Sequence, residues 1–119
     1  MTPLPDEALV VRGGRNLPGS FVQGSGVAVD AGGRIQGVSV NSAAGLSLQE
    51  LTASDPRTGY PGIPHNQVGV TTVGAIRAAG GEVIPSPTRT NRHHATLGGL
   101  TPDQASSLFR PMVGNPNRR

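Results

Sequence analysis

The chain has 119 residues, the length of one ordinary domain. Its ten basic residues are all arginine and face seven acidic residues, so the formal net charge is only +3. The chain contains no cysteine, which excludes a disulfide framework, a thiolate nucleophile and Cys-ligated zinc. No apolar stretch approaches the ~20 residues of a membrane-spanning helix, so we expect a soluble protein without a membrane partner.

The composition predicts a lean core. Hydrophobic residues make up 34% of the chain, which also holds 18 glycines and 11 prolines. Low net charge and several Val/Ile-rich segments favour a folded, loop-rich domain over disorder. We expect a flexible Pro-rich lead-in over residues 1–7, one compact domain over residues 8–113, and a basic tail over residues 114–119.

The first half of the chain is predicted to be mainly extended. An apolar run over residues 8–12 ends at a Gly-Gly pair, which is typical of a buried strand. Residues 27–29 and 34–40 predict two strands joined by a four-residue hairpin connection, with a bulge at Gly37 as an option.

Helices and strands then alternate. The motif Ser47-x-x-Glu50 is a capping box and predicts a short helix over residues 48–54. A Pro/Gly-rich loop over residues 55–66 follows, long enough to be mobile or functional. Residues 67–71 predict a strand, and residues 73–79 predict a helix that ends at a Gly-Gly pair.

The last part of the chain is predicted to contain two strands and a helix. The strands cover residues 82–84 and 92–97, separated by a Pro-containing loop. The helix begins at Thr101-Pro102-Asp103-Gln104, which combines an N-cap, a proline at the first helical position and a capping-box glutamine. The order of elements indicates an α+β fold, a small, twisted, largely antiparallel sheet with three short helices.

The strand over residues 92–97 offers the best site for chemistry. Neighbouring side chains of a strand point to opposite faces, so Arg92, His94 and Thr96 are predicted to share one face while His93 points to the core. A cation, an imidazole and a hydroxyl in a row can bind an anion, move a proton and stabilise negative charge. The alternative is an ordinary solvent-exposed strand face. Adjacent strand histidines cannot chelate one metal together, so we expect no metal site.

Four further residues complete the set of candidates. Arg12 closes the first strand beside glycines that allow a ligand to approach, or it is an edge residue in a turn. His65 is either an acid or base opposite His94 or an exposed loop residue. Ser39 can bond a ribose or phosphate, or merely solvate its strand. Glu82 is the one carboxylate we nominate as a general base, since the other acidic residues fit turns and caps.

These motifs resemble the C-terminal catalytic domains of bacterial polymorphic and secreted toxins. The resemblance rests on a strand ending in Arg-Gly-Gly, a Gly-Val-Ser-Val strand, and a late His-x-Thr strand followed by a capped helix. Small ribonucleases of the barnase/EndoU/colicin/RelE type would match through His94, Thr96 and Arg92 or Arg12. ADP-ribosyltransferase-like toxins would match through Arg12 and Ser39, with Glu82 as their late glutamate.

The leading prediction is a metal-independent ribonuclease-like toxin domain without a cofactor. The resemblance implies RNA as substrate, a cognate immunity protein as partner, and action in the cytoplasm after secretion within a longer polypeptide. One alternative is ADP-ribosyl transfer, with NAD bound between Arg12 and Ser39. Another is a non-enzymatic module that contacts a partner through residues 55–66, with Tyr60 as a contact residue.

Overall fold

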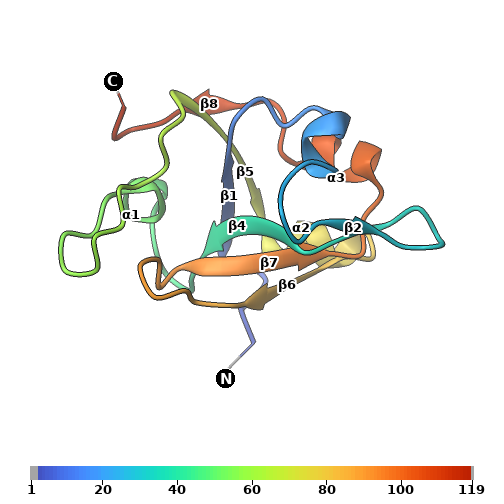
Figure 1. Ribbon diagram of the computed structural model, residues 1–119, viewed down its shortest axis with the longest axis horizontal. Coiled ribbons are helices and arrows are strands. Elements are labelled where there is room, and N and C mark those ends of the chain that lie inside the picture. Colours follow the sequence, from blue (N-terminus) through green and yellow to red (C-terminus); the bar gives the residue numbers. More distant parts are fainter. Residues whose placement is uncertain (1–2, 119) are drawn as a thin grey trace.

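The computed structural model describes residues 3–118, in which three α-helices pack on two antiparallel sheets (Figure 1). This confirms the α+β prediction. The strands are β1 (Leu9–Gly13), β2 (Ala28–Val29), β3 (Ile35–Gln36), β4 (Val38–Ser42), β5 (Gln67–Thr72), β6 (Glu82–Pro85), β7 (His94–Gly98) and β8 (Val113–Gly114). The helices are α1 (Leu48–Thr52), α2 (Val73–Ala78), α3 (Pro102–Leu108) and the 3-10 helix η1 (Pro18–Phe21). The larger sheet has the order β6-β7-β4-β1-β5-β8, and β2 pairs with β3.

The larger sheet bends sharply between β1 and β4. In Figure 1, β1 and β5 run upright while β4, β7 and β6 run across the view. Strand β1 pairs with β5 at five positions but with β4 at only two, where Val10 faces Ser42 and Val11 faces Asn41. Beyond Val11 the two strands separate, so the sheet opens between the end of β1 and the middle of β4.

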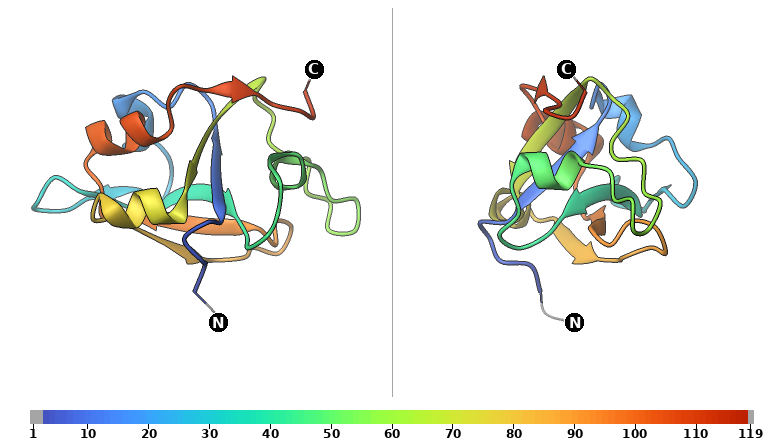
Figure 2. Two further views of the ribbon diagram at one scale, coloured as in Figure 1. Left: turned by 180° about the vertical axis from the view of Figure 1, so that it is seen from behind. Right: turned by 90° about the vertical axis from the view of Figure 1, so that its left-hand side faces the viewer.

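One face of the sheet carries the main core. Alternate residues of β4 and β7, among them Val38, Val40 and Leu97, are buried there together with Ile76 of α2. The rings of Phe21 and Phe109 pack with centroids 5.7 Å apart and join η1 to α3, which lie side by side (Figure 2). Helices α2 and α3 thus cover the same face of the larger sheet.

The opposite face is covered over only part of its area. Helix α1 places Leu51 against Val11, Ile63 and Val68, which form a second, smaller core. Of the residues of β4 and β7 that point to this side, Ser39 is exposed and His94 is half-buried, whereas Asn41 is buried. A polar strip of the sheet therefore lies open beside α1.

The three α-helices begin as their sequences indicate. Ser47 and Thr101 each form a complete capping box, and the hydroxyl of Thr72 accepts a hydrogen bond from the amide of Ala75. Helix α1 ends at Thr52, two residues before its predicted end. In residues 3–118 the longest helix has seven residues, and none is long and apolar enough to cross a membrane.

Two predicted strands have the wrong boundaries. Gly37 has φ +80°, and a side chain there would overlap the carbonyl oxygen of Gly26, so the predicted strand over residues 34–40 is divided into β3 and β4. The predicted strand over residues 92–97 begins only at His94, because residues 92 and 93 form a turn.

Parts of the predicted lead-in and tail contact the rest of the fold where the structure describes them. Leu4 is buried in the main core, and Asp6 forms an ion pair of 2.7 Å with Arg77. The unpredicted strand β8 pairs with β5, and the buried side chain of Asn115 donates to the carbonyl oxygens of Ile63 and His65. The first two residues and the last one, which belong to the predicted lead-in and tail, lie outside the described residues.

Substitution of Leu97 tests how much the main core contributes to stability. Its side chain is fully buried in the middle of the sheet, so Leu97→Ala is expected to lower the free energy of unfolding by about 2–5 kcal/mol. Val29→Ala is the control, because Val29 is 51% exposed and its truncation should change stability by less than about 0.5 kcal/mol. Urea unfolding measures both changes, and equal losses would contradict this account of the core.

Candidate functional site

The opening between β1 and β4 is a cleft of about 350 Å³. We call it the β1–β4 cleft. It brings together four of the residues nominated from the sequence, Arg12, Ser39, His65 and His94. The remaining lining residues are Val11, Gly13, Val40, Asn41, Tyr60, Ile63, Pro64 and Asn91. Residues from both halves of the chain therefore meet where the sheet divides.

His94 is held in one orientation. Its Nδ1 lies 3.0 Å from the carbonyl oxygen of Ser86, and its Nε2 lies 3.0 Å from the Oγ of Ser39. The Ser86 hydroxyl also reaches Nδ1; in the tautomer that bonds the carbonyl oxygen, which only accepts, Nδ1 carries the hydrogen. In the neutral imidazole Nε2 then has a free lone pair, which faces the Ser39 hydroxyl. His94 is thus arranged as a base directed at β4.

Ser86 is a site residue that the sequence analysis missed. Its Oγ lies 2.9 Å from Nδ1 of His94 and 2.7 Å from Oγ1 of Thr96. The predicted shared face of His94 and Thr96 is confirmed, but Thr96 bonds Ser86 and does not line the cleft. Thr96 therefore acts through Ser86 as a positioning residue for His94.

His65 lines the cleft beside β1. Its ring lies against Gly13, where any side chain would overlap the ring and come within 2.6 Å of Ile63 Cγ2. The carbonyl oxygen of His65 accepts a hydrogen bond of 2.9 Å from Asn115. Because His65 lies by β1 and His94 lies on β7 next to β4, two imidazoles line the cleft from different walls.

Arg12 is committed to the loop that follows β1. Its Nη1 donates to Oδ1 of Asn16 at 2.8 Å and its Nη2 donates to the carbonyl oxygen of Ser20 at 2.9 Å. The guanidinium also lies 4.4 Å from the ring centre of Phe21. Burial lowers the pKa of Arg12, which nevertheless stays protonated. Arg12 thus fixes this loop, and its guanidinium packs on the main-core side of β1, on the other face of the sheet from Ser39 and His94.

Two buried asparagines join the cleft to its surroundings. Asn91 donates to Oδ1 of Asn41 at 2.8 Å, and Asn41 donates to the Tyr60 hydroxyl at 3.1 Å and to the carbonyl oxygen of Leu51. Both amides are nearly inaccessible to solvent, so these bonds strongly favour one arrangement. The network holds β4, the 55–66 loop and the turn before β7 together.

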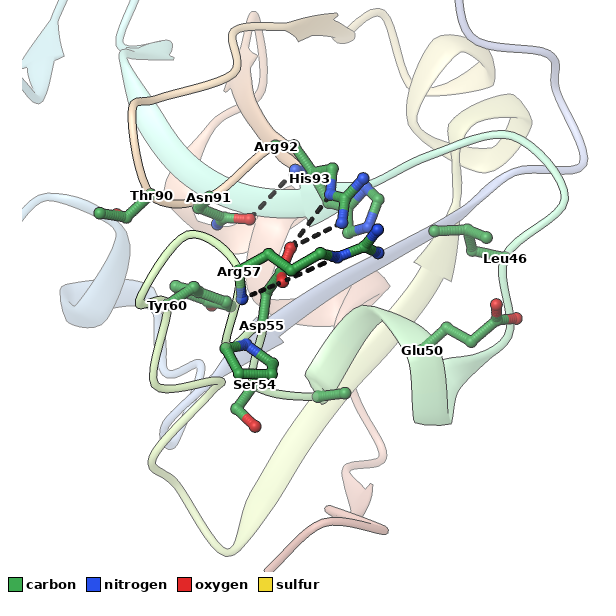
Figure 3. A pocket seen from close by; sticks show the side chains of 12 residues that line it. Leu46, Glu50, Ser54, Asp55, Arg57, Tyr60, Thr90, Asn91, Arg92 and His93 are labelled. Atoms are coloured by element: carbon green, nitrogen blue, oxygen red, sulfur yellow. Dashed lines mark hydrogen bonds and ion pairs between the residues drawn. The ribbon is translucent and has the colours of Figure 1, made fainter.

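Arg92 does not belong to the β1–β4 cleft. Its Nη2 and Nε donate to Oδ2 of Asp55 at 2.8 and 3.1 Å, and Arg57 lies 3.9 Å from the other carboxylate oxygen. These residues line a neighbouring pocket of about 510 Å³, here called the Asp55 pocket (Figure 3). The prediction that Arg92 shares a face with His94 is wrong, because the turn before β7 directs it elsewhere.

His93 also differs from its prediction. It is half-buried and lines the Asp55 pocket, so the expectation that it points into the core is wrong. Burial lowers the pKa of His93, and the charge of Arg92 lowers it further, while Asp55 and Glu50 partly offset both effects. The hydrogen bond from Arg92 is the main cause that lowers the pKa of Asp55. The pocket therefore favours an ionised carboxylate beside a neutral imidazole.

Glu82, the nominated general base, lies outside the cleft. Its Oε1 forms an ion pair of 3.0 Å with Arg77 and accepts from the amide of Val83. It lines a third, smaller pocket together with Thr96. None of the described residues that line the β1–β4 cleft is Asp or Glu. In residues 3–118 no group of three His, Asp or Glu side chains is placed to hold a metal ion.

The lowered pKa of His93 predicts a measurable pH dependence of the free energy of unfolding. Because its pKa in the fold lies below the ordinary 6.5, the unfolded chain binds more protons near that value, and the free energy of unfolding falls as pH drops through it. His93→Gln removes this contribution, so the variant should lose less stability than wild type between pH 7 and pH 5. Urea unfolding at both pH values gives the slopes, and identical slopes would refute the assignment.

Comparisons with known proteins add no relative. Family models, curated proteins and solved structures were each compared with the chain, and none of them matches it. The activity therefore has to be argued from the β1–β4 cleft and its side chains.

Proposed function

We propose that the protein cleaves RNA in the β1–β4 cleft by metal-independent transphosphorylation. The observation that carries the proposal is the orientation of His94, whose Nδ1 is bound to a backbone carbonyl so that Nε2 faces an open cleft. His65 lines the same cleft from the wall by β1. The resemblance to toxin ribonucleases noted in the sequence points to the same chemistry.

The proposed reaction uses one imidazole as base and the other as acid. His94 Nε2 takes the proton of a ribose 2′-hydroxyl, whose oxygen attacks the neighbouring phosphorus. His65, in its protonated form, gives a proton to the departing 5′-oxygen. The products are a 2′,3′-cyclic phosphate and a free 5′-hydroxyl. In the free protein the Ser39 hydroxyl, 3.0 Å from Nε2, stands where the 2′-hydroxyl would bind.

The charge of the cleft suits a phosphate. The described lining residues include no carboxylate to oppose an anion, and the guanidinium of Arg12 adds a permanent positive charge behind the wall that β1 forms. Tyr60 accepts its hydrogen bond from Asn41, which leaves the Tyr60 hydrogen free to donate to a phosphate oxygen. Tyr60 and Asn91 also border the Asp55 pocket, so a nucleotide chain can continue toward Arg92.

ADP-ribosyl transfer is the second candidate. It is favoured by the finding that Arg12 and Ser39, the residues that match such toxins, line one cleft. It ranks second because its late glutamate would have to be Glu82, which is paired with Arg77 away from the cleft. For either activity the resemblance supports delivery within a longer polypeptide, action in the cytoplasm and a cognate immunity protein.

The ribonuclease proposal predicts a large effect of one histidine. On total RNA and tRNA in the presence of EDTA, His94→Ala should lower kcat/KM by at least about 100-fold, because it removes the general base. Ser25→Ala is the control and should keep its activity, since Ser25 is exposed and does not line the β1–β4 cleft. Cyclic phosphate ends are measured by mass spectrometry. Intact RNA with wild-type protein would refute the proposal, and binding through residues 55–66 would then be tested with Tyr60→Ala.

Experiments with NAD distinguish ADP-ribosyl transfer from RNA cleavage. Under the ribonuclease proposal, calorimetry with wild-type protein and NAD should give no heat of binding, and labelled NAD should transfer no label to components of a lysate. Transfer of label by wild type, lost in Ser39→Ala, would instead establish ADP-ribosyl transfer. Ser25→Ala, which changes an exposed loop serine that does not line the β1–β4 cleft, is the matched control.

A further inference from the structure

We propose that Ser39 is a nucleophile activated by His94, which forms a covalent ester with electrophilic phosphorus in phosphate or phosphonate esters that lack a neighbouring hydroxyl. The arrangement is that of an activated nucleophile, namely a hydroxyl, a base within hydrogen-bond distance, and a third group that orients the base. Here these are Ser39 Oγ, His94 Nε2 and the carbonyl oxygen of Ser86. The inference does not rest on RNA cleavage.

The position of Ser39 combines a fixed backbone with an accessible hydroxyl. Its neighbours Val38 and Val40 are buried in the main core, and the strand is paired with β7 at Ser39 itself, opposite Thr96. The Ser39 side chain is exposed and lines the β1–β4 cleft. The oxygen is therefore held near its base while a ligand can still reach it.

Two buried serines elsewhere in the fold form different hydrogen bonds from the exposed Ser39. Ser42 donates to the carbonyl oxygen of Leu9 at 2.6 Å, and Ser106 donates to that of Asn16 at 2.8 Å. Such hydroxyls donate to backbone carbonyl oxygens, which do not take up the proton, so these serine oxygens are not activated as nucleophiles. In Ser39 the partner is an imidazole nitrogen that can accept the proton as the oxygen attacks.

The chemical step balances with the groups present. Ser39 Oγ forms a bond to phosphorus while its proton moves to Nε2 of His94. The bond from phosphorus to the leaving group breaks, and that group takes the proton from Nε2. During the step the positive imidazolium keeps its Nδ1 hydrogen bond to the carbonyl oxygen of Ser86. In RNA the substrate 2′-hydroxyl takes the place of Ser39 at the base, so the serine reacts with esters that have no such hydroxyl.

The first test uses an alkyl fluorophosphonate as the electrophile. Wild-type protein should gain one phosphonyl group on the peptide that contains Ser39, with loss of fluoride, as measured by mass spectrometry. Ser39→Ala should abolish this label, and His94→Ala should slow labelling by at least about 100-fold. Ser25→Ala, which changes an exposed loop serine, should label like wild type. Labelling of other residues, or equal rates with and without His94, would overturn the inference.

A second test needs no knowledge of the electrophile. The chain has no cysteine, so Ser39→Cys introduces a single thiol beside His94. Its alkylation by iodoacetamide at pH 6.5 should be about tenfold faster than that of Ser25→Cys, because an adjacent imidazole lowers a thiol pKa. Adding His94→Ala should remove the difference. Equal rates in the folded variants, checked by circular dichroism, would contradict activation by His94.

The two proposals fail separately. RNA cleavage by wild-type protein without fluorophosphonate labelling would overturn the role of Ser39 and leave the ribonuclease intact. If the protein does not cleave RNA but is labelled in a reaction that depends on His94, the ribonuclease proposal is overturned and the role of Ser39 stands.

Discussion

The site depends on the separation of β1 from β4. These strands share only two paired positions, although each pairs more extensively with its other neighbour. Twist accumulates between adjacent strands, and a sheet of six strands can relieve it by dividing. Once it divides, β1 and β5 follow one direction and β4, β7 and β6 another, as Figure 1 shows. The cleft is the space that this division leaves, and its side chains come from both halves.

The orientation of His94 is the second requirement, and it comes from Ser86, directly after β6. A histidine at the edge of a cleft would otherwise rotate and alternate between tautomers. The carbonyl oxygen and hydroxyl of Ser86 both reach Nδ1, and Thr96 bonds the same hydroxyl. In the tautomer with its hydrogen on Nδ1, the free lone pair points at β4. Both proposals use this lone pair, and they differ only in whether a substrate hydroxyl or that of Ser39 delivers the proton.

Local signals in the sequence predicted much of the fold. The capping boxes at Ser47 and Thr101 place two helix starts correctly, because a cap depends on residues three positions apart. Strand alternation also places His94 and Thr96 on one face. The errors arise where the outcome depends on distant segments. The turn that moves Arg92 away is held by Asn91, whose partner Asn41 lies 50 residues earlier, and Ser86 meets His94 only through the register of β6 and β7.

Charge distinguishes the β1–β4 cleft from the Asp55 pocket. They share Tyr60 and Asn91, so they are neighbours on one surface. In the Asp55 pocket the carboxylate bonds Arg92 and lies near Arg57, and an incoming phosphate would have to compete with it. The described residues that line the β1–β4 cleft include no carboxylate, and Arg12 bonds neutral groups only, on the far side of β1. Under the ribonuclease proposal, the phosphate would therefore bind in the cleft that holds both imidazoles, where none of the described lining residues is a carboxylate that competes with it.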